Sequence, residues 1–327
     1  MVDESARIDS VPHWFAGVRL NFAENVLYTP SPGSRSKRAT RHKEASKVAI
    51  TEVREGASSI RTLTWGELRA RVARMALALR AHGVRKGDRV AVVASNSIDT
   101  LVVFLGCTAL GGVFSSSSTD MGSVGVLERL LQIEPVWVFI DDWAVYNGRT
   151  VNLRGKMAEI MAGMKGVKGF KGLVSQPRFE EQADVRAVKG VTTLRDFLGV
   201  VDEENVGKDG ERLQFERVDF RDPFLIVYSS GTTGQPKCIV HSTGGVVLSA
   251  MKEGRLHRET GPDSVCLQYT TTGWIMYLGS VQALLFGARV VMYDGSPFVP
   301  DLLTFIRLIG EQRYVKPGGR LHQTSLI

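Results

Sequence analysis

Ten consecutive residues, Tyr228 to Lys237, combine side chains and backbone that suit phosphate groups. They read Y-S-S-G-T-T-G-Q-P-K and directly follow the apolar run F-L-I-V. The Ser and Thr hydroxyls can donate hydrogen bonds to phosphate oxygens, and the glycines can take the positive φ that turns successive N–H groups toward one centre. The final lysine adds a compact positive charge. The pattern predicts a strand that runs into an anion-binding loop. The expected ligands are Ser229, Ser230, Gly231, Thr232, Thr233, Gly234 and Lys237.

Other kinds of loop have to be weighed against this prediction. The composition alone would also fit a Ser/Thr/Gly turn between two strands. The Walker A pattern G-x-x-x-x-G-K-[ST] fails, because Gly231 and Gly234 are three residues apart and Lys237 is followed by Cys238. No G-x-G-x-x-G follows a predicted strand either. A P-loop NTPase and a dinucleotide-binding fold are therefore excluded.

The loop resembles the phosphate-loop signature of the adenylate-forming superfamily, which includes acyl-CoA synthetases, luciferases and the adenylation domains of peptide synthetases. That family usually has Gly after the lysine, where this chain has Cys238. Residues 14–25, W-F-A-G-V-R-L-N-F-A-E-N, resemble the N-terminal motif of the branch that ligates acetoacetate or acetate to CoA. Residues 270–276, T-T-T-G-W-I-M, and 293–297, Y-D-G-S-P, resemble the acetoacetate-specific members. The resemblance covers residues 14 to 311, nearly the whole chain.

The resemblance implies activation of acetoacetate with ATP and Mg²⁺ to an acyl-adenylate, followed by transfer to the thiol of CoA. The loop residues would then hold the ATP phosphates. Trp274, Ile275 and Met276 would shape a small acyl pocket, although a buried helix start whose side chains pack in the core is the alternative. His241 could contact substrate or be structural, and Asp294 is expected to cap a turn. No metal-binding cluster of the protein itself is expected.

Later motifs of the family have no match, namely an aromatic–Thr–Glu segment, a ribose-binding aspartate, an arginine and the catalytic lysine. We therefore assign no catalytic residue and expect impaired activity in a truncated chain without the small C-terminal domain. The expected organisation is an N-terminal docking segment and basic loop (1–46), a partial AMP-binding domain (47–312) and a divergent tail (313–327). Two alternatives stay open: a non-catalytic remnant that binds a nucleotide or a partner, and a ligase for acetate or another short acid.

Apolar runs and helical periods alternate along the chain, which predicts an α/β fold of mostly parallel β-sheets with covering helices. Thr64 and Glu67 form a capping-box pattern for a helix over 65–82. Residues 48–53 and 59–63 are expected to pair as a hairpin, and 145–215 give only weak signals, with helices near Met157 and Leu194. Further strands are predicted at 88–94, 136–140, 264–268 and 288–293, and helices at 97–109, 127–133, 245–258, 274–286 and 300–310.

Composition restricts the kinds of partner. The 327 residues carry 43% hydrophobic and 23% charged side chains, which are globular values, and their formal charge of +7 raises the question of a nucleic-acid partner. The basic residues cluster in polar stretches without aromatic interleaving, so a nucleic-acid partner is not expected and small-molecule substrates are. Three cysteines lack metal spacing and have apolar neighbours, so buried free thiols are expected. Without a signal peptide or a long apolar stretch, we expect a cytoplasmic protein without a membrane span.

Overall fold

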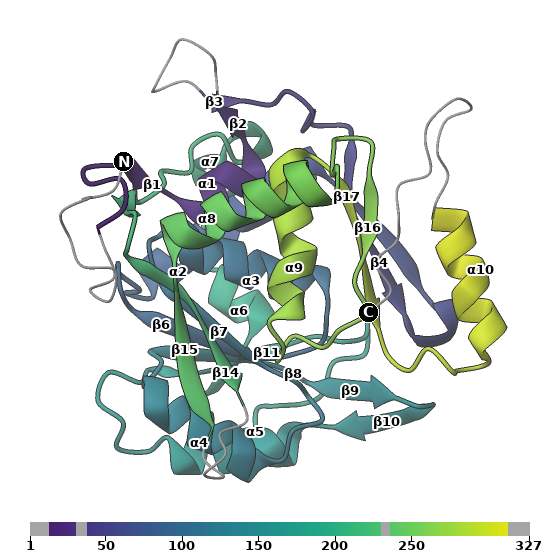
Figure 1. Cartoon of the computed structure of the whole chain (residues 1–327). Helices are drawn as coiled ribbons and strands as arrows, with labels where there is room; N and C mark the ends of the chain where they lie inside the picture. The colour runs from purple at the N-terminus through teal and green to yellow at the C-terminus, as the bar shows by residue number, and fades with distance from the viewer. Residues whose placement is uncertain (1–12, 31–37, 230–235, 313–327) are drawn as a thin grey trace.

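The computed structural model describes residues 13–30, 38–229 and 236–312, and their largest sheet has seven strands (Figure 1). Its neighbours are parallel except for the last pair, β14 and β15, which is antiparallel. The strand order is β12 (Val191–Thr193), β11 (Gly172–Gln176), β8 (Trp137–Asp141), β6 (Arg89–Val93), β7 (Val113–Ser117), β14 (Pro223–Ser229) and β15 (Lys237–Ser242).

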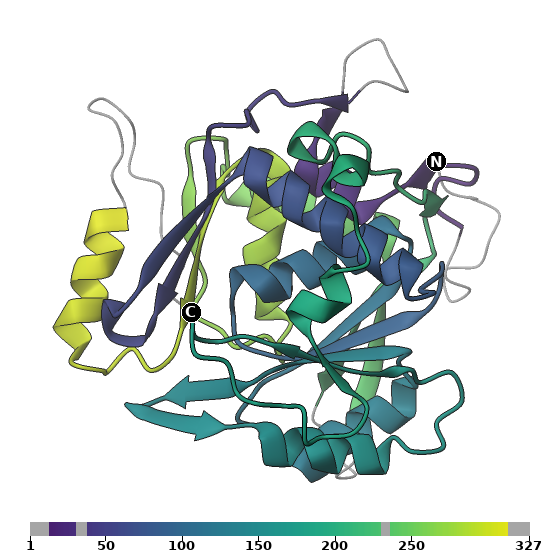
Figure 2. The same ribbon diagram turned by 180° about the vertical axis from the view of Figure 1, so that it is seen from behind.

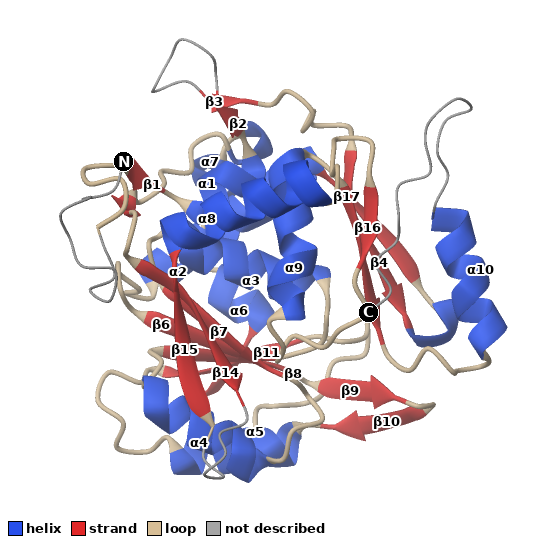
Figure 3. Cartoon of the chain, viewed as in Figure 1, coloured by secondary structure: helices blue, strands red, loops and turns tan. Residues whose placement is uncertain are grey.

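A second, smaller sheet stands beside the first one (Figure 3). Its order is β16 (Val265–Leu267), β17 (Arg289–Asp294), β4 (Val48–Arg54) and β5 (Ile60–Thr64). β16, β17 and β4 are parallel, and β4 pairs with β5 as an antiparallel hairpin. Both the α/β class with mostly parallel sheets and the predicted β4–β5 hairpin are confirmed.

Helices form layers around the two sheets (Figures 1 and 2). One core joins the facing surfaces of both sheets to α1 (Phe22–Leu27), α2 (Trp65–Ala81), α3 (Ile98–Ala109), α8 (Thr243–Lys252) and α9 (Met276–Gln282). The other face of the large sheet is covered by α4 (Ser123–Ile133) and α5 (Arg154–Gly163). The outer face of the small sheet is covered by α10 (Leu302–Gln312).

α3 lies at the centre of this arrangement. Nearly every residue of the helix is buried, as expected for a helix that is apolar all round. The ring of Phe104 stacks on Phe114 of β7 and on Phe22 of α1, with centroids 4.4 and 5.4 Å apart. Gly106 lets α2 approach closely, because a Cβ there would lie 2.7 Å from Cγ of Met75. α2 and α3 therefore pack closely in the core that the two sheets share.

Most predicted elements are present, with shifted ends. α2 begins with the predicted capping box of Thr64 and Glu67. α8 ends at Lys252 and continues as a π-helical turn, Glu253–His257, where one longer helix was predicted. The helix predicted over 274–286 begins at Met276 and tightens to a 3₁₀ turn at Ala283–Phe286. Short helices α6 (Leu194–Leu198) and α7 (Glu203–Val206) follow β12.

The sequence did not predict several strands. They include β7, β11, β12, β15 and a separate hairpin of β9 (Trp143–Tyr146) and β10 (Arg149–Asn152). Two-stranded pairs also link β1 (Arg19–Leu20) to β13 (Val218–Asp219), and β2 (Thr29–Pro30) to β3 (Arg38–Ala39).

The N-terminal segment contributes to the main core through α1. Phe22 is 1% exposed and packs in this core, whereas Trp14 is 44% exposed. The domain boundary at residue 46 stays a prediction, and the tail 313–327 lies outside the described residues. Within the described ranges, no helix is both long and apolar enough to cross a bilayer.

Candidate functional site

The carboxyl edge of the large sheet, where its parallel strands end, carries several polar segments. β6 pairs with β7 on one side and with β8 on the other, so the chain reverses its direction of winding at β6. In open α/β sheets, ligands bind outside the carboxyl ends of strands at such a switch point. The residues at these strand ends are 94–97 after β6, 118–120 after β7, and Asp141 and Asp142 at the end of β8.

The segment 270–273 crosses over from the small sheet and is fixed to this edge. Thr272, 2% exposed, donates through Oγ1 to the carbonyls of Ala94 (2.7 Å) and Ser117 (3.2 Å). The hydroxyl of Ser116 in turn donates to the carbonyl of Thr272 at 2.6 Å. A Cβ on Gly273 would lie 3.1 Å from the backbone nitrogen of Ser118, so the backbones approach closely there. The carboxyl edges of the two sheets are thereby joined.

The three residues predicted to shape the acyl pocket follow directly after this segment. Trp274, Ile275 and Met276 are 63%, 40% and 40% exposed. Their side chains are not core residues of the described structure, so the alternative of a buried helix start is wrong. Their role in an acyl pocket stays a prediction.

The predicted phosphate loop connects β14 and β15. Ser229 pairs with Lys237 at the base of this hairpin, whereas Ser230, Gly231, Thr232, Thr233 and Gly234 lie outside the described residues. Because β14 pairs with β7 in the register Ile226–Ser115, Ser229 ends its strand beside the segment that follows Ser117. The loop therefore starts at the same edge to which Thr272 is fixed, and the side chain of Lys237 is exposed there.

Tyr228 fixes the base of the loop. Its hydroxyl donates to the carbonyl of Arg129 at 3.2 Å, and the Arg129 guanidinium lies 5.3 Å from its ring centre. Burial raises the pKa of Tyr228 to about 12, so the hydroxyl stays a donor. His241 lies opposite Leu225, at the end of β15 away from the loop, and burial lowers its pKa. This placement favours the structural alternative for the histidine.

A cavity of about 130 Å³ lies between the strand ends of the two sheets. Asp294, expected to cap a turn, instead ends β17 and pairs with Nη2 of Arg178 at 2.5 Å. Asp141 accepts a hydrogen bond from the backbone of Ser95 at 2.8 Å, yet burial raises its pKa to about 7. The cavity is lined by residues 94–96, 118–120, 145–146, 269–272 and 293–295.

A larger groove of about 400 Å³ continues outward and shares Thr119, Asp120 and Tyr146 with the inner cavity. The β9–β10 hairpin forms one wall and presents Arg149, and α5 contributes Lys156. Nζ of Lys156 donates to the carbonyls of Thr119 (2.6 Å) and Met121 (2.7 Å). These cations flank a mostly apolar groove, which suits a ligand with an anionic head and an apolar arm. This wall was not predicted from the sequence.

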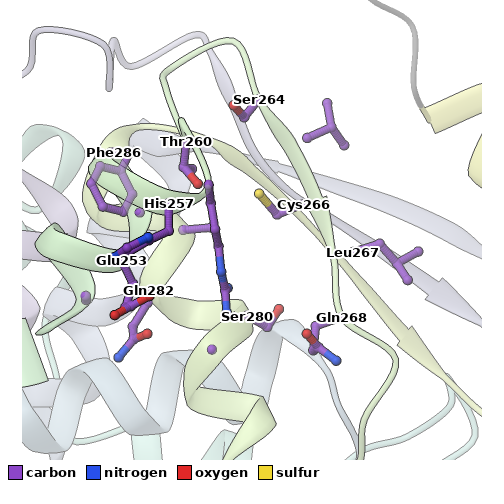
Figure 4. A pocket seen from close by; sticks show the side chains of 16 residues that line it. Glu253, His257, Thr260, Ser264, Cys266, Leu267, Gln268, Ser280, Gln282 and Phe286 are labelled. Carbon is purple, nitrogen blue, oxygen red and sulfur yellow. The ribbon is translucent and has the colours of Figure 1, made fainter. Parts of the chain in front are cut away.

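A third cavity, of about 140 Å³, lies beside β16 and is lined by the end of α8, its π-helical turn and α9 (Figure 4). Figure 4 shows Gln268 and Ser280 at one end of the cavity and Thr260 and Phe286 at the other. This cavity contains none of the residues predicted to bind ATP or the acyl group.

The three free cysteines differ in burial. Cys107 is buried as expected, but Cys238 and Cys266 are only partly buried, and Cys238 donates to Oε1 of Gln132 at 3.1 Å. Among the residues that the structure describes, no group of three His, Cys, Asp or Glu side chains could hold a metal ion.

Comparisons with known proteins agree with this fold. The acetoacetyl-CoA synthetase of Gallus gallus is 39% identical over 303 residues, which are 92% of this chain and 42% of the relative. A malonamoyl-CoA synthetase of Penicillium aethiopicum is 35% identical over 91% of this chain and 39% of its own length. A solved structure of the acetoacetyl-CoA synthetase from Streptomyces lividans superimposes with a TM-score of 0.75 at 33% identity, over 89% of this chain and 41% of that one. The chain thus spans about two fifths of the length of these relatives. A family model described as AMP-binding enzyme matches residues 36–314, so the chain belongs to the AMP-binding enzyme family.

Proposed function

We propose that this chain carries the ATP-phosphate-binding and acyl-binding part of an acetoacetate–CoA ligase. In the proposed reaction, a carboxylate oxygen of acetoacetate attacks the α-phosphorus of ATP, and pyrophosphate leaves. The thiol of CoA then attacks the acyl carbonyl of the adenylate, forms the thioester and releases AMP. Mg²⁺ would accompany the ATP phosphates and neutralise part of their charge.

The observation that carries the proposal is the meeting of two sequence-distant segments at one sheet edge. Ser229 and Lys237 hold the ends of the phosphate loop at this edge, and the hydrogen bonds of Thr272 fix the start of the acyl segment to the same edge. Because adenylate formation joins a carboxylate to a phosphate, both must be held within reach of each other. The choice of acetoacetate as the acid rests on the names of the relatives.

The outer groove is our candidate for the CoA site. CoA has an anionic nucleotide end and a long, largely apolar arm with the thiol at its tip. The groove offers Arg149 and Lys156 to the anionic end, and the shared residues Thr119, Asp120 and Tyr146 make it continuous with the cavity at the strand ends. A thiol that enters by the groove would therefore approach the edge where the acyl group is proposed to lie.

Calorimetric titration with Mg-ATP and with Mg-tripolyphosphate tests the phosphate loop, because tripolyphosphate needs no adenine pocket. We expect Lys237→Ala to bind both ligands about tenfold or more weakly than the wild type, since hydrogen bonds to charged groups contribute about 1.5–3 kcal/mol. Lys252→Ala is the matched control, because Lys252 lies on α8 and pairs with Glu253 at 2.8 Å. Equal affinities for the wild type and Lys237→Ala would contradict the proposal.

A second candidate acid follows from the malonamoyl-CoA synthetase relative. Malonamate has the same heavy-atom skeleton as acetoacetate, with an amino group in place of the methyl. A pocket built to bind the amino group through hydrogen bonds would reject the methyl strongly, whereas an apolar pocket would separate the two acids only weakly. Thermal-shift titrations with acetoacetate, malonamate and acetate in the presence of Mg-ATP rank the acids. The largest shift with malonamate or acetate would reject acetoacetate as the substrate.

We also infer a reducing, cytoplasmic location. The three cysteines of the chain are all free, as expected where glutathione keeps thiols reduced. Fractionation of cells that express the tagged chain tests this inference, and recovery with secreted proteins would reject it.

A further inference from the structure

The buried carboxylate of Glu55 joins three segments that are distant in the sequence. Glu55 follows β4 and is 6% exposed. Oε2 accepts hydrogen bonds from the backbone nitrogens of Asn147 (2.7 Å) and Ser296 (2.5 Å), and Oε1 accepts one from Gly148 (2.6 Å). Hydrogen bonds to a charged acceptor are among the strong ones, and here they satisfy a carboxylate that would otherwise be costly to bury.

Two of the three donors form the turn of the β9–β10 hairpin. Tyr146 pairs with Arg149, so Asn147 and Gly148 are the two loop residues. Their φ angles of 52° and 73° are both positive, as in the Asn-Gly turn typical of tight hairpins. The hairpin extends away from the large sheet in both views of the molecule (Figures 1 and 2). Glu55 therefore ties the tip of an extended hairpin to the second sheet.

The surroundings of Glu55 hold its side chain in place. Gly295, at φ 124°, passes so close that a Cβ there would overlap the Cβ of Glu55. The hydroxyl of Tyr293 donates to the carbonyl of Ser296 at 2.9 Å and accepts from the backbone of Gly56 at 3.3 Å. The carboxylate is thus seated on the rigid end of the small sheet, and the hairpin turn is the part that it positions.

We propose that Glu55 is a positioning residue, which holds the β9–β10 hairpin in place as the wall of the outer groove and so sets the affinity of the groove for CoA. This inference rests on the proposed function, because the groove is the candidate CoA site. Tyr146, Arg149 and Val151 line the groove from this hairpin, so a free tip would move the cation that is expected to meet the anionic end of CoA.

Glu55→Gln tests the proposal with little change in shape. The amide keeps a single acceptor oxygen, which can serve either Gly148 or the pair Asn147 and Ser296, but not all three N–H groups. We expect hydrogen exchange to become about tenfold faster or more at the amide of Asn147 or of Gly148, whichever loses its acceptor, since each bond had a charged acceptor. We expect the affinity for CoA, measured by calorimetry, to fall by about the same factor while the affinity for Mg-ATP stays unchanged.

Two further variants separate positioning from general destabilisation. Thr64→Ala removes the hydroxyl that caps α2, at the end of the β4–β5 hairpin opposite Glu55, so it should destabilise the fold while exchange at 147–148 and CoA affinity stay at wild-type values. Glu55→Asp keeps the charge but is one methylene shorter. It should therefore keep at most part of the protection of the Asn147 and Gly148 amides against hydrogen exchange.

Hydrogen exchange and CoA affinity each test a different part of the proposal. Unchanged exchange at Asn147 and Gly148 in Glu55→Gln overturns the positioning role itself. Faster exchange with unchanged CoA affinity overturns the link between the hairpin and the groove. If the wild type binds no CoA, the groove assignment in the proposed function fails, and the exchange data still decide whether Glu55 holds the hairpin.

Discussion

Replacing Asp141 by asparagine should stabilise the fold above pH 7 and have little effect near pH 4. Asp141 ends β8 with 4% exposure, and burial raises its pKa to about 7, although the N–H of Ser95 donates to Oδ2 at 2.8 Å. In the unfolded chain the pKa of an aspartate is about 3.9. Between about pH 4 and 7, the folded protein therefore keeps a proton that the unfolded chain has released.

The direction in which stability changes with pH follows from this difference in bound protons. Stability falls as the pH rises through the window, and above pH 7 the full cost of a buried charge is present. The difference between about 7 and the ordinary value of 3.8 corresponds to at most about 4 kcal/mol. The asparagine side chain would carry no charge and could still accept from Ser95, but that bond loses its charged acceptor, which offsets about 1 kcal/mol. We expect a net gain of about 2–3 kcal/mol at pH 8.

Urea unfolding followed by far-UV circular dichroism from pH 4 to 8 measures this effect for the wild type and Asp141→Asn. Asp263→Asn, a change at an exposed carboxylate, controls for the altered net charge. The difference between the wild type and Asp141→Asn should widen from pH 4 to 7 and then level off. Parallel curves over the whole range would refute the claim that burial governs this carboxyl group.

Two further substitutions test local structure. Thr64→Ala should cost about 1 kcal/mol of unfolding free energy, because Oγ1 of Thr64 caps α2 through the N–H of Glu67, and the same urea assay would contradict this with an unchanged midpoint. Gly244→Ala should cost about 1–3 kcal/mol, because a Cβ there would fall on the ring of Phe220. Gly279→Ala in α9, with open space around it, is the control and should be neutral or stabilising by up to about 1 kcal/mol; equal losses for the two glycine variants would argue against the steric explanation.

Elements that bury one face against a single core could be predicted from the sequence. The capping pattern of Thr64 and Glu67 marked the start of α2, and the buried residues from Leu68 to Leu79 recur at helical spacing. The β4–β5 hairpin and the alternation of strands and helices followed from the same kind of local signal.

The strands that the sequence missed lack that signal for identifiable reasons. β7 reads V-F-S-S-S, a serine-rich run typical of a loop, yet all five residues are buried. The serines are tolerated because their hydroxyls have acceptors: Ser115 donates to the carbonyl of Ile226 at 3.0 Å and Ser116 to that of Thr272. Such bonds depend on tertiary contacts that a local pattern does not contain. The Asn147-Gly148 dipeptide, in contrast, was a usable hairpin signal for β9 and β10.

The candidate site, too, could be predicted only in part from the sequence. The ten-residue loop and the acyl segment were visible as motifs, but the register that brings Ser229 and Thr272 to one edge depends on the pairing of β14 with β7. The Glu55 contacts were not predictable at all, because each donor is a backbone N–H far away in the sequence.

Two buried polar atoms without a hydrogen-bond partner in the described structure belong to residues that line the cavity between the two sheets. They are Oγ of Ser95 and Oδ1 of Asn96, which directly follow β6, whereas others, such as Nε1 of Trp65 and the hydroxyl of Tyr277, belong to residues of the main core. Native cores satisfy almost all such groups, because each one left unpaired costs about 1–3 kcal/mol. A protein that had only to pack its sheets together would gain stability from apolar side chains here. The retention of polar groups around the cavity is therefore what we expect where water, substrate or nucleotide completes the hydrogen bonds.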